Sequence, residues 1–201
     1  MRATITGAIV AGGASSRFGG LAKGLFRVGG ERIVDRIANA LRPAVDSIAI
    51  VSSAPDANTW LEGAAVWRDE RDGRASIIGI HTALVHADKV MVVAWDMPFV
   101  TEQLVGALVD RLTPAASAVV PLGPHGPEPM CALYTRECLA PLEAALETGD
   151  LRMTAFVERL PGAVRLPTEE IARIGDPARL FFNVNTPEDL SLAEEMAARD
   201  G

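Results

Sequence analysis

The sequence predicts an α/β fold, a single domain with a mixed, mostly parallel sheet covered by helices on both faces. Patterns typical of strands and helices alternate through about residue 120, as they do in βαβ units. Two stretches, 5–11 and 89–95, are apolar almost throughout, which is typical of strands buried on both faces. The 201 residues contain no linker-like or repetitive segment, so one domain over 1–201 is expected.

Hydrophobic spacing and helix-ending residues locate the elements of the first part of the chain. Ile33, Ile37 and Leu41 recur every fourth residue and predict a helix over 33–41, which Pro43 ends. The same reasoning gives strands at 47–51, 64–67, 89–95 and 117–120, helices at 76–85 and 101–112, and a short helix near Trp60.

The second part of the chain is less regular. We expect a strand at 130–134, helices at 137–146 and 151–160, an edge strand at 164–166 and a last strand at 181–184. Thr186 then begins the final helix, because a threonine N-cap is followed by Pro187 at the first helical position and by an acid at the third.

Composition and charge exclude several classes of protein. The net charge of −7 makes binding to DNA or RNA a poor hypothesis, and no apolar run reaches the roughly 18 residues of a membrane span. Cys131 and Cys138 lack a metal-binding spacing, so we expect reduced thiols. Together with the lack of a signal-peptide pattern, they predict a cytoplasmic location. The first 42 residues are nevertheless basic, which suits a small phosphorylated ligand bound locally.

The glycine-rich stretch 12–23 has the chemistry of a phosphate-binding loop. Glycines allow backbone N–H groups to approach a polyanion closely, and Arg17 and Lys23 add positive charge. The stretch matches neither the Walker motif nor the G-x-G-x-x-G motif of dinucleotide-binding proteins. The alternative is an ordinary glycine-rich turn with a solvated arginine and lysine.

Two aspartates directly follow predicted strands, where ligands bind in open α/β sheets. Asp96 ends the apolar strand 89–95, and Pro98 prevents a regular continuation of that strand. Its carboxylate could hold Mg²⁺ or could cap a turn. Asp69 follows the strand at 64–67 and is either a ligand or one solvated acid in a run of charges.

Asn183 and Asn185 flank Val184, so in an extended chain their side chains would point to the same side. Such a pair could contact a ligand from one strand. The alternative is a simple strand-to-helix turn, which Thr186 and Pro187 indicate in any case. Both readings can hold together, because Asn185 is not needed for the helix cap.

Several of these segments together resemble one known family. The stretch A-I-V-A-G-G-A-S-S-R-F-G-G-L-A-K at 8–23 resembles the L-A-G-G-x-S-x-R-M-G-x-x-K signature of nucleotidyltransferases, and is most similar to molybdenum cofactor guanylyltransferases of the MobA type. D-M-P at 96–98, P-M-C-A-L-Y at 129–134 and N-V-N-T-P-E-D-L at 183–190 resemble later family segments, in family order. The resemblance implies a Rossmann-like fold with a mixed sheet.

The resemblance also implies an activity and a set of site residues. The family transfers GMP from GTP to the molybdenum-bound molybdopterin cofactor and releases pyrophosphate, with Mg²⁺ bound. Asp96 then looks like the Mg²⁺ ligand, and Lys23 and Arg17 would offset charge during catalysis. The implied nucleotide-site residues are Val10, Ala11, Gly12, Gly13, Lys23, Asp69, Asp96, Asn183 and Asn185.

The family pattern further implies a division of labour along the chain. Residues 1–120 would bind the nucleotide and 121–201 the acceptor, with Arg152 meeting its phosphate. A transient contact with the apo-molybdoenzyme that receives the cofactor would follow. No contact with nucleic acid or membrane is implied.

Departures from the family pattern keep other activities open. Ala75-Ser76 replaces a Gly-Pro pair, and V-S-S at 51–53 lacks the usual asparagine, so the base and the acceptor are less certain than the reaction type. The Gly12-Gly13 pair favours guanine, because related cytidylyltransferases tend to have Ala-Ala-Gly there. The alternatives are CTP as donor, another small phosphate as acceptor, or a catalytically silent cofactor carrier. The absence of G-x-G-x-x-G disfavours a nicotinamide-binding protein.

Overall fold

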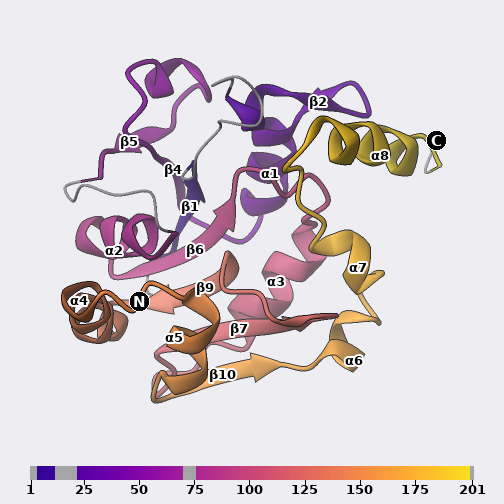
Figure 1. The fold of residues 1–201 in the computed structure, drawn as a ribbon. Coiled ribbons are helices and arrows are strands. Elements are labelled where there is room, and N and C mark those ends of the chain that lie inside the picture. Colours follow the sequence, from indigo (N-terminus) through magenta and orange to yellow (C-terminus); the bar gives the residue numbers. More distant parts are fainter. Residues whose placement is uncertain (1–3, 12–21, 70–75, 200–201) are drawn as a thin grey trace.

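The computed structural model describes residues 4–11, 22–69 and 76–199 and shows one twisted sheet between two layers of helices (Figure 1). Within those residues, seven strands follow one another across the sheet in the order β10-β7-β9-β6-β1-β4-β5, and β8 pairs with β7 alone. Their bounds are β1 (Thr6–Val10), β4 (Ser47–Val51), β5 (Ala65–Trp67), β6 (Lys89–Ala94), β7 (Ala118–Gly123), β8 (Gly126–Pro127), β9 (Cys131–Thr135) and β10 (Ala163–Leu166).

The sheet is parallel except around β9. The pairs β1–β4, β1–β6, β4–β5 and β7–β10 are parallel, whereas β9 runs antiparallel to both β6 and β7. β8 forms an antiparallel pair with the end of β7. A separate antiparallel ribbon joins β2 (Arg27–Val28) to β3 (Glu31–Arg32). The expected mixed, mostly parallel sheet is therefore confirmed.

Helices cover both faces of the sheet because side chains alternate along each buried strand. One face packs against α1 (Ile33–Leu41), α3 (Glu102–Asp110), α6 (Thr168–Ile171) and α7 (Pro177–Leu180), whereas α8 (Pro187–Ala198) lies beside β2 and adds Ala193 to the same core. The other face packs against α2 (Ser76–His86), α4 (Leu139–Thr148) and α5 (Met153–Arg159). Short 3-10 turns are η2 (Lys23–Leu25), η3 (Ala57–Thr59) and η4 (Arg136–Cys138).

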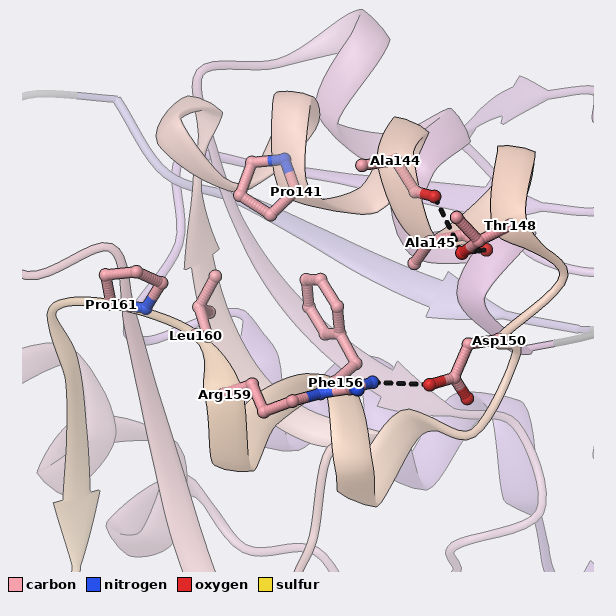
Figure 2. A pocket seen from close by; sticks show the side chains of 9 residues that line it. All are labelled: Pro141, Ala144, Ala145, Thr148, Asp150, Phe156, Arg159, Leu160 and Pro161. Carbon is pink, nitrogen blue, oxygen red and sulfur yellow. Dashed lines mark hydrogen bonds and ion pairs between the residues drawn. The ribbon is translucent and has the colours of Figure 1, made fainter.

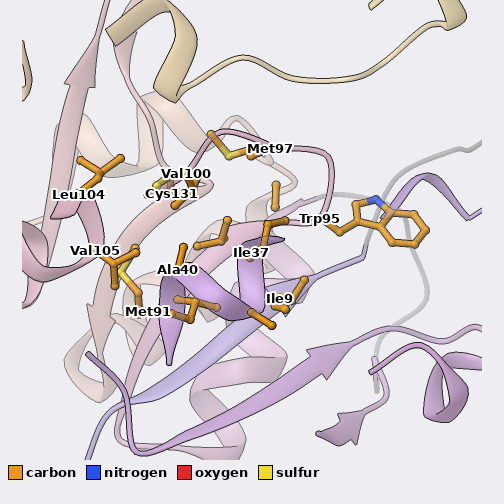
Figure 3. Packing of buried hydrophobic residues seen from close by; sticks show 14 of the residues in the cluster. Ile9, Ile37, Ala40, Met91, Trp95, Met97, Val100, Leu104, Val105 and Cys131 are labelled. Atoms are coloured by element: carbon orange, nitrogen blue, oxygen red, sulfur yellow. The ribbon is translucent and has the colours of Figure 1, made fainter. Parts of the chain in front are cut away.

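Two hydrophobic cores result, one on each side of the sheet. Ile9 of β1 lies in the core under α1, whereas its neighbours Ala8 and Val10 lie in the core under α2. Figure 3 shows the first core, which includes Ile9, Met91 and Leu104. Because both faces of the central strands are covered, the ends of those strands are the parts left for ligands.

The structure departs from the sequence-based expectations in a few short segments. The helix expected near Trp60 is instead the 3-10 turn η3, which ends one residue earlier. The strand expected at 181–184 is wrong: this segment crosses the end of β6, and its Val184 N–H donates to the carbonyl of Asp96 at 2.8 Å rather than to a neighbouring strand. The β2–β3 ribbon, β8, α6 and α7 were not expected.

In the part of the chain that the structure describes, no helix is both long enough and apolar enough to cross a membrane.

Candidate active site

The candidate site lies at the carboxyl edge of the sheet, where the strand order reverses. β4 and β5 follow β1 on one side, and β6 follows it on the other, so a crevice is expected beyond the ends of β1 and β6. The antiparallel β9 brings its first residues to the same edge, because the N–H of Ala94 donates to the carbonyl of Met130 at 2.8 Å. Segments from both halves of the sequence therefore meet there.

Lys23, Asp96 and Asn185 meet at this edge although they are far apart in the sequence. The Lys23 ammonium donates a hydrogen bond of 2.9 Å to Asn185 Oδ1 and lies 3.8 Å from Asp96 Oδ2. Only 12% of the Lys23 side chain and 15% of the Asp96 side chain are exposed. The ammonium is thus held between a carboxylate and an amide oxygen in a largely desolvated setting.

Backbone contacts and a helix cap fix Asn185 beside the lysine. Asp189 Oδ2 accepts from the backbone N–H of Asn185 at 2.9 Å and from that of Thr186 at 2.8 Å. Thr186 Oγ1 in turn accepts from the N–H of Asp189, which completes the capping box at the start of α8. Together with the Val184–Asp96 bond, this cap ties the C-terminal segment to the end of β6.

The Asp96 carboxylate is mostly buried, with 15% of its side chain exposed. Burial raises its pKa, and the charge of Lys23 only partly offsets that effect. A divalent cation would favour the ionised form, because it supplies positive charge where water has been removed. The described residues hold no cluster of three or more His, Cys, Asp or Glu side chains that could bind a metal. The buried Asp96 carboxylate is compatible with Mg²⁺, which is often held by one or two carboxylates together with substrate phosphates.

Asp69 is held at the end of β5 by a different element. Its Oδ1 accepts a hydrogen bond of 2.9 Å from the hydroxyl of Thr82, which lies buried in α2. Ser52 lies nearby, at the end of β4, in the segment V-S-S that lacks the asparagine usual in the family. The Ser52 side chain is buried and its Oγ accepts from the N–H of Ala54 at 3.2 Å, so this hydroxyl stabilises its own turn.

Asn183 and Asn185 have different hydrogen-bond partners in the structure. Asn185 reaches Lys23, whereas the Asn183 amide donates to the carbonyl of Phe181 at 2.9 Å. The difference follows from the irregular backbone of this segment, which does not alternate as a strand does.

Backbone groups at the carboxyl end of β1 already form hydrogen bonds with the neighbouring strands. The carbonyl of Val10 accepts from the N–H of Trp95 at 3.2 Å, and the N–H of Ala11 donates to the carbonyl of Val51 at 2.9 Å. These residues therefore shape the crevice in this structure by fixing β1 against β4 and β6. Gly12, Gly13 and Arg17 lie outside the described residues.

A second hollow, of about 270 Å³, lies between α4 and α5 (Figure 2). Phe156 and Leu160 line it together with Pro141, and Asp150 sits at its rim, bound to Arg159 at 2.5 Å. Among the described residues, none of those expected at the nucleotide site lines this hollow. Arg152, which was expected to face the acceptor, donates to Asp150 at 3.2 Å and is largely exposed.

Sequence reasoning missed several residues that support the site. Thr82 holds Asp69, Asp189 holds Asn185, and the ring of Trp95 lies against Gly24, next to Lys23. The Thr186–Asp189 spacing is a capping-box signal and could have indicated the second of these. The other contacts join segments more than ten residues apart and leave no periodic pattern in the sequence.

A doubly covered α/β sheet with this cluster at its point of strand reversal is the arrangement of a nucleotidyltransferase. Residues 7–164 match the family model described as the MobA-like NTP transferase domain, and the chain belongs to that family. The molybdenum cofactor guanylyltransferase of Desulfosudis oleivorans is 34% identical over 194 residues, covering 94% of each chain. A probable molybdenum cofactor guanylyltransferase of Pelotomaculum thermopropionicum is also 34% identical, covering 96% of this chain and 93% of the relative.

Solved structures agree with the family assignment. Molybdopterin-guanine dinucleotide biosynthesis protein A of Archaeoglobus fulgidus superposes with a TM-score of 0.80 at 29% identity, covering 96% of this chain and 99% of that one. A cytidylyltransferase of Thermus thermophilus, at 18% identity, shares the fold with a TM-score of 0.67. The same architecture therefore occurs in proteins named for different bases.

Proposed function

We propose that this protein transfers GMP from GTP to the terminal phosphate of the molybdenum-bound molybdopterin cofactor and releases pyrophosphate. The observation that carries the proposal is the meeting of Lys23, Asp96 and Asn185 at the carboxyl edge of the sheet. Relatives named molybdenum cofactor guanylyltransferase, which match nearly the whole chain, support the choice of donor and acceptor.

The reaction needs no nucleophile from the protein. An oxygen of the pterin phosphate attacks the α-phosphorus of GTP in line, and the bond from that phosphorus to the bridging oxygen of pyrophosphate breaks. Catalysis then rests on positioning the reactants and offsetting developing charge. Lys23, with Arg17, offsets the charge that moves onto pyrophosphate.

Asp96 holds Mg²⁺ in this proposal, and the metal supplies charge neutralisation at the phosphates. Asn185 orients the Lys23 ammonium through their hydrogen bond. Asp69, steadied by Thr82, and Asn183 contact the nucleotide, as do the backbone groups of Val10, Ala11, Gly12 and Gly13. Residues 1–120 form the nucleotide-binding part and 121–201 the acceptor-binding part, with Arg152 on the pterin side.

The proposal extends to the setting of the reaction. The enzyme works in the cytoplasm and passes the finished cofactor to an apo-molybdoenzyme during a transient contact. Two buried cysteines and the biosynthetic role of the named relatives support this setting.

Calorimetric titration with GTP, CTP and ATP, each with Mg²⁺, tests the choice of base. Tight binding of GTP alone is the expected result, and the transfer assay with molybdopterin cofactor then follows. Preferential binding of CTP would make the enzyme a cytidylyltransferase with the same mechanism. A protein that binds none of the three nucleotides, with or without the acceptor, would contradict the proposal and indicate a silent carrier.

A further inference from the structure

Trp95 occupies an unusual place between β6 and the candidate metal ligand. It follows the last residue of β6 and directly precedes Asp96, and only 5% of it is exposed. Its backbone N–H donates to Val10, so the main chain is fixed to β1. Its ring stacks on that of Trp60, with 5.1 Å between the ring centroids and 26° between the planes.

Trp60, which stacks on this ring, is itself held in place. It is 3% exposed, and its indole N–H donates to Asp56 Oδ2 at 3.1 Å. The two stacked indole rings therefore restrict each other's position, because moving one ring would displace the other and break that hydrogen bond.

Gly24 lies against the ring of Trp95. A Cβ on Gly24 would be 2.8 Å from Trp95 Cε3 and 3.4 Å from Trp95 Cδ2. The backbone at Gly24 is not in the left-handed region, so its conformation does not demand glycine. The close approach of the tryptophan ring is what excludes a larger residue.

We propose that Trp95 is a positioning residue that sets the distance of Lys23 from Asp96. Lys23 is the first residue of the turn η2, and Gly24 is the second. The distance between Gly24 and the indole ring therefore fixes the position of the Lys23 backbone. Trp95 is also adjacent to Asp96 in the chain. The position of Trp95 therefore affects both Lys23 and Asp96, whose charged groups lie 3.8 Å apart. The inference rests on the proposed function, because it concerns the charge that Lys23 supplies during nucleotidyl transfer.

The first test substitutes the glycine. Gly24→Ala pushes η2 off the ring by several tenths of an ångström, and turnover should fall on the order of tenfold to a hundredfold, as misplaced catalytic groups do. Gly106→Ala is the matched control, because a Cβ there meets nothing within 4 Å. It should leave turnover unchanged.

Two double variants separate positioning from a general loss of structure. Gly24→Ala with Trp95→Leu should turn over no more slowly than Trp95→Leu alone, because the clash disappears with the ring. In a Lys23→Ala background, Gly24→Ala should cause no further loss, since the lysine through which it acts is gone. A further loss in that background, or a Gly24→Ala enzyme with normal turnover, would overturn the proposal.

If Gly24→Ala does not fold, Trp95 variants carry the same test. Trp95→Phe keeps a flat ring and should stay nearer wild-type turnover than Trp95→Leu, and neither should lower turnover further when Lys23 is alanine. Unchanged turnover in Trp95→Leu would overturn the proposal. Titration of the wild-type protein with Mg²⁺ and GTP is run alongside: absence of binding there rejects the proposed function, whereas normal binding with unaffected variants rejects this inference alone.

Discussion

Lys23 shows how one buried charge can organise a site. Its side chain is 12% exposed, and its ammonium has oxygen partners from two distant segments. A charge in such a setting interacts strongly with any phosphate that enters, because little water screens it. The same setting makes its removal costly to the reaction.

Lys23→Ala should lower turnover with GTP by on the order of 10²–10³, equivalent to about 2.7–4 kcal/mol of transition-state stabilisation, as for the loss of one strong donor to a developing anion. Steady-state kinetics at saturating Mg²⁺ measure the effect. Unchanged turnover would remove Lys23 from the proposed mechanism.

Asp96→Asn keeps the shape of the side chain but removes its charge. We expect the variant to lose Mg²⁺-dependent turnover, because a neutral amide is a weaker ligand for a hard cation than a carboxylate. Activity is measured over a range of Mg²⁺ concentrations. Activity that persists and still rises with Mg²⁺ would place the metal on another residue.

The sequence indicated the polar residues of the candidate site but not the residues that hold them in place. Lys23, Asp96 and Asn185 were predicted because they stand in a glycine-rich stretch, at a strand end and before a helix, respectively. Thr82 and Trp95 were missed because a hydroxyl in an apolar helix and a tryptophan after an apolar strand both look like core residues. Only the packing of distant segments gives them their contacts.

The start of helix α8 connects the stability of that helix with the position of Lys23 in the candidate site. Its capping box uses Thr186 and Asp189, and Asp189 also holds the backbone of Asn185, which contacts Lys23. Loosening this helix end should therefore disturb the ammonium as well as the helix.

Thr186→Ala should lower the free energy of unfolding by about 0.5–2 kcal/mol, the usual effect of losing an N-cap. Turnover should fall as well, because Asn185 loses part of its anchor. Urea unfolding and kinetics check the two effects. Ser191→Ala, on the exposed side of the same helix, is the control and should change stability by less than about 0.5 kcal/mol. Full stability and activity in Thr186→Ala would contradict the coupling.

The connection between β8 and β9 carries a titrating group. Burial raises the pKa of Glu128 to about 7 from an ordinary value of 4.5. The folded protein therefore binds this proton more readily than the unfolded chain, so stability should rise as pH falls from about 7 toward 4.5. Glu128→Gln should remove that part of the dependence. Melting temperatures of both proteins measured across this range would contradict the prediction if the two curves ran parallel.

Elements were predictable in proportion to their length and burial. The two apolar runs predicted β1 and β6, and helical spacing predicted α1, because a pattern over many residues is less affected by any single residue. The segment 181–184 was misjudged because its apolar residues, such as Phe181, pack against the core without pairing with a strand. The two-residue strands and four-residue helices are too short for periodicity to reveal.

The whole molecule consists of two cores that share one sheet, and each contains a cysteine. Cys131 faces the core under α1, and Cys138 faces the core under α2. Burial raises the pKa of Cys138 to about 12 and that of Cys131 further still. Because the thiolate is the reactive form, both thiols should be inert in the native protein.

Both cysteines should react with a thiol reagent only when the whole domain unfolds. Labelling rates measured at increasing denaturant should follow global unfolding for the two sites alike, with the sites distinguished by mass spectrometry. Rapid labelling of one site in native buffer would show that its core opens separately.

The bond between Lys23 and Asn185 spans 162 positions of the chain. A ribosome that adds roughly 5–20 residues per second needs roughly 8–32 s to make that span. Throughout this time the nascent chain has its lysine but lacks the asparagine that holds it. A growing polypeptide therefore cannot bring Lys23, Asp96 and Asn185 together until residue 185 has been made, and the order of synthesis itself delays the appearance of activity.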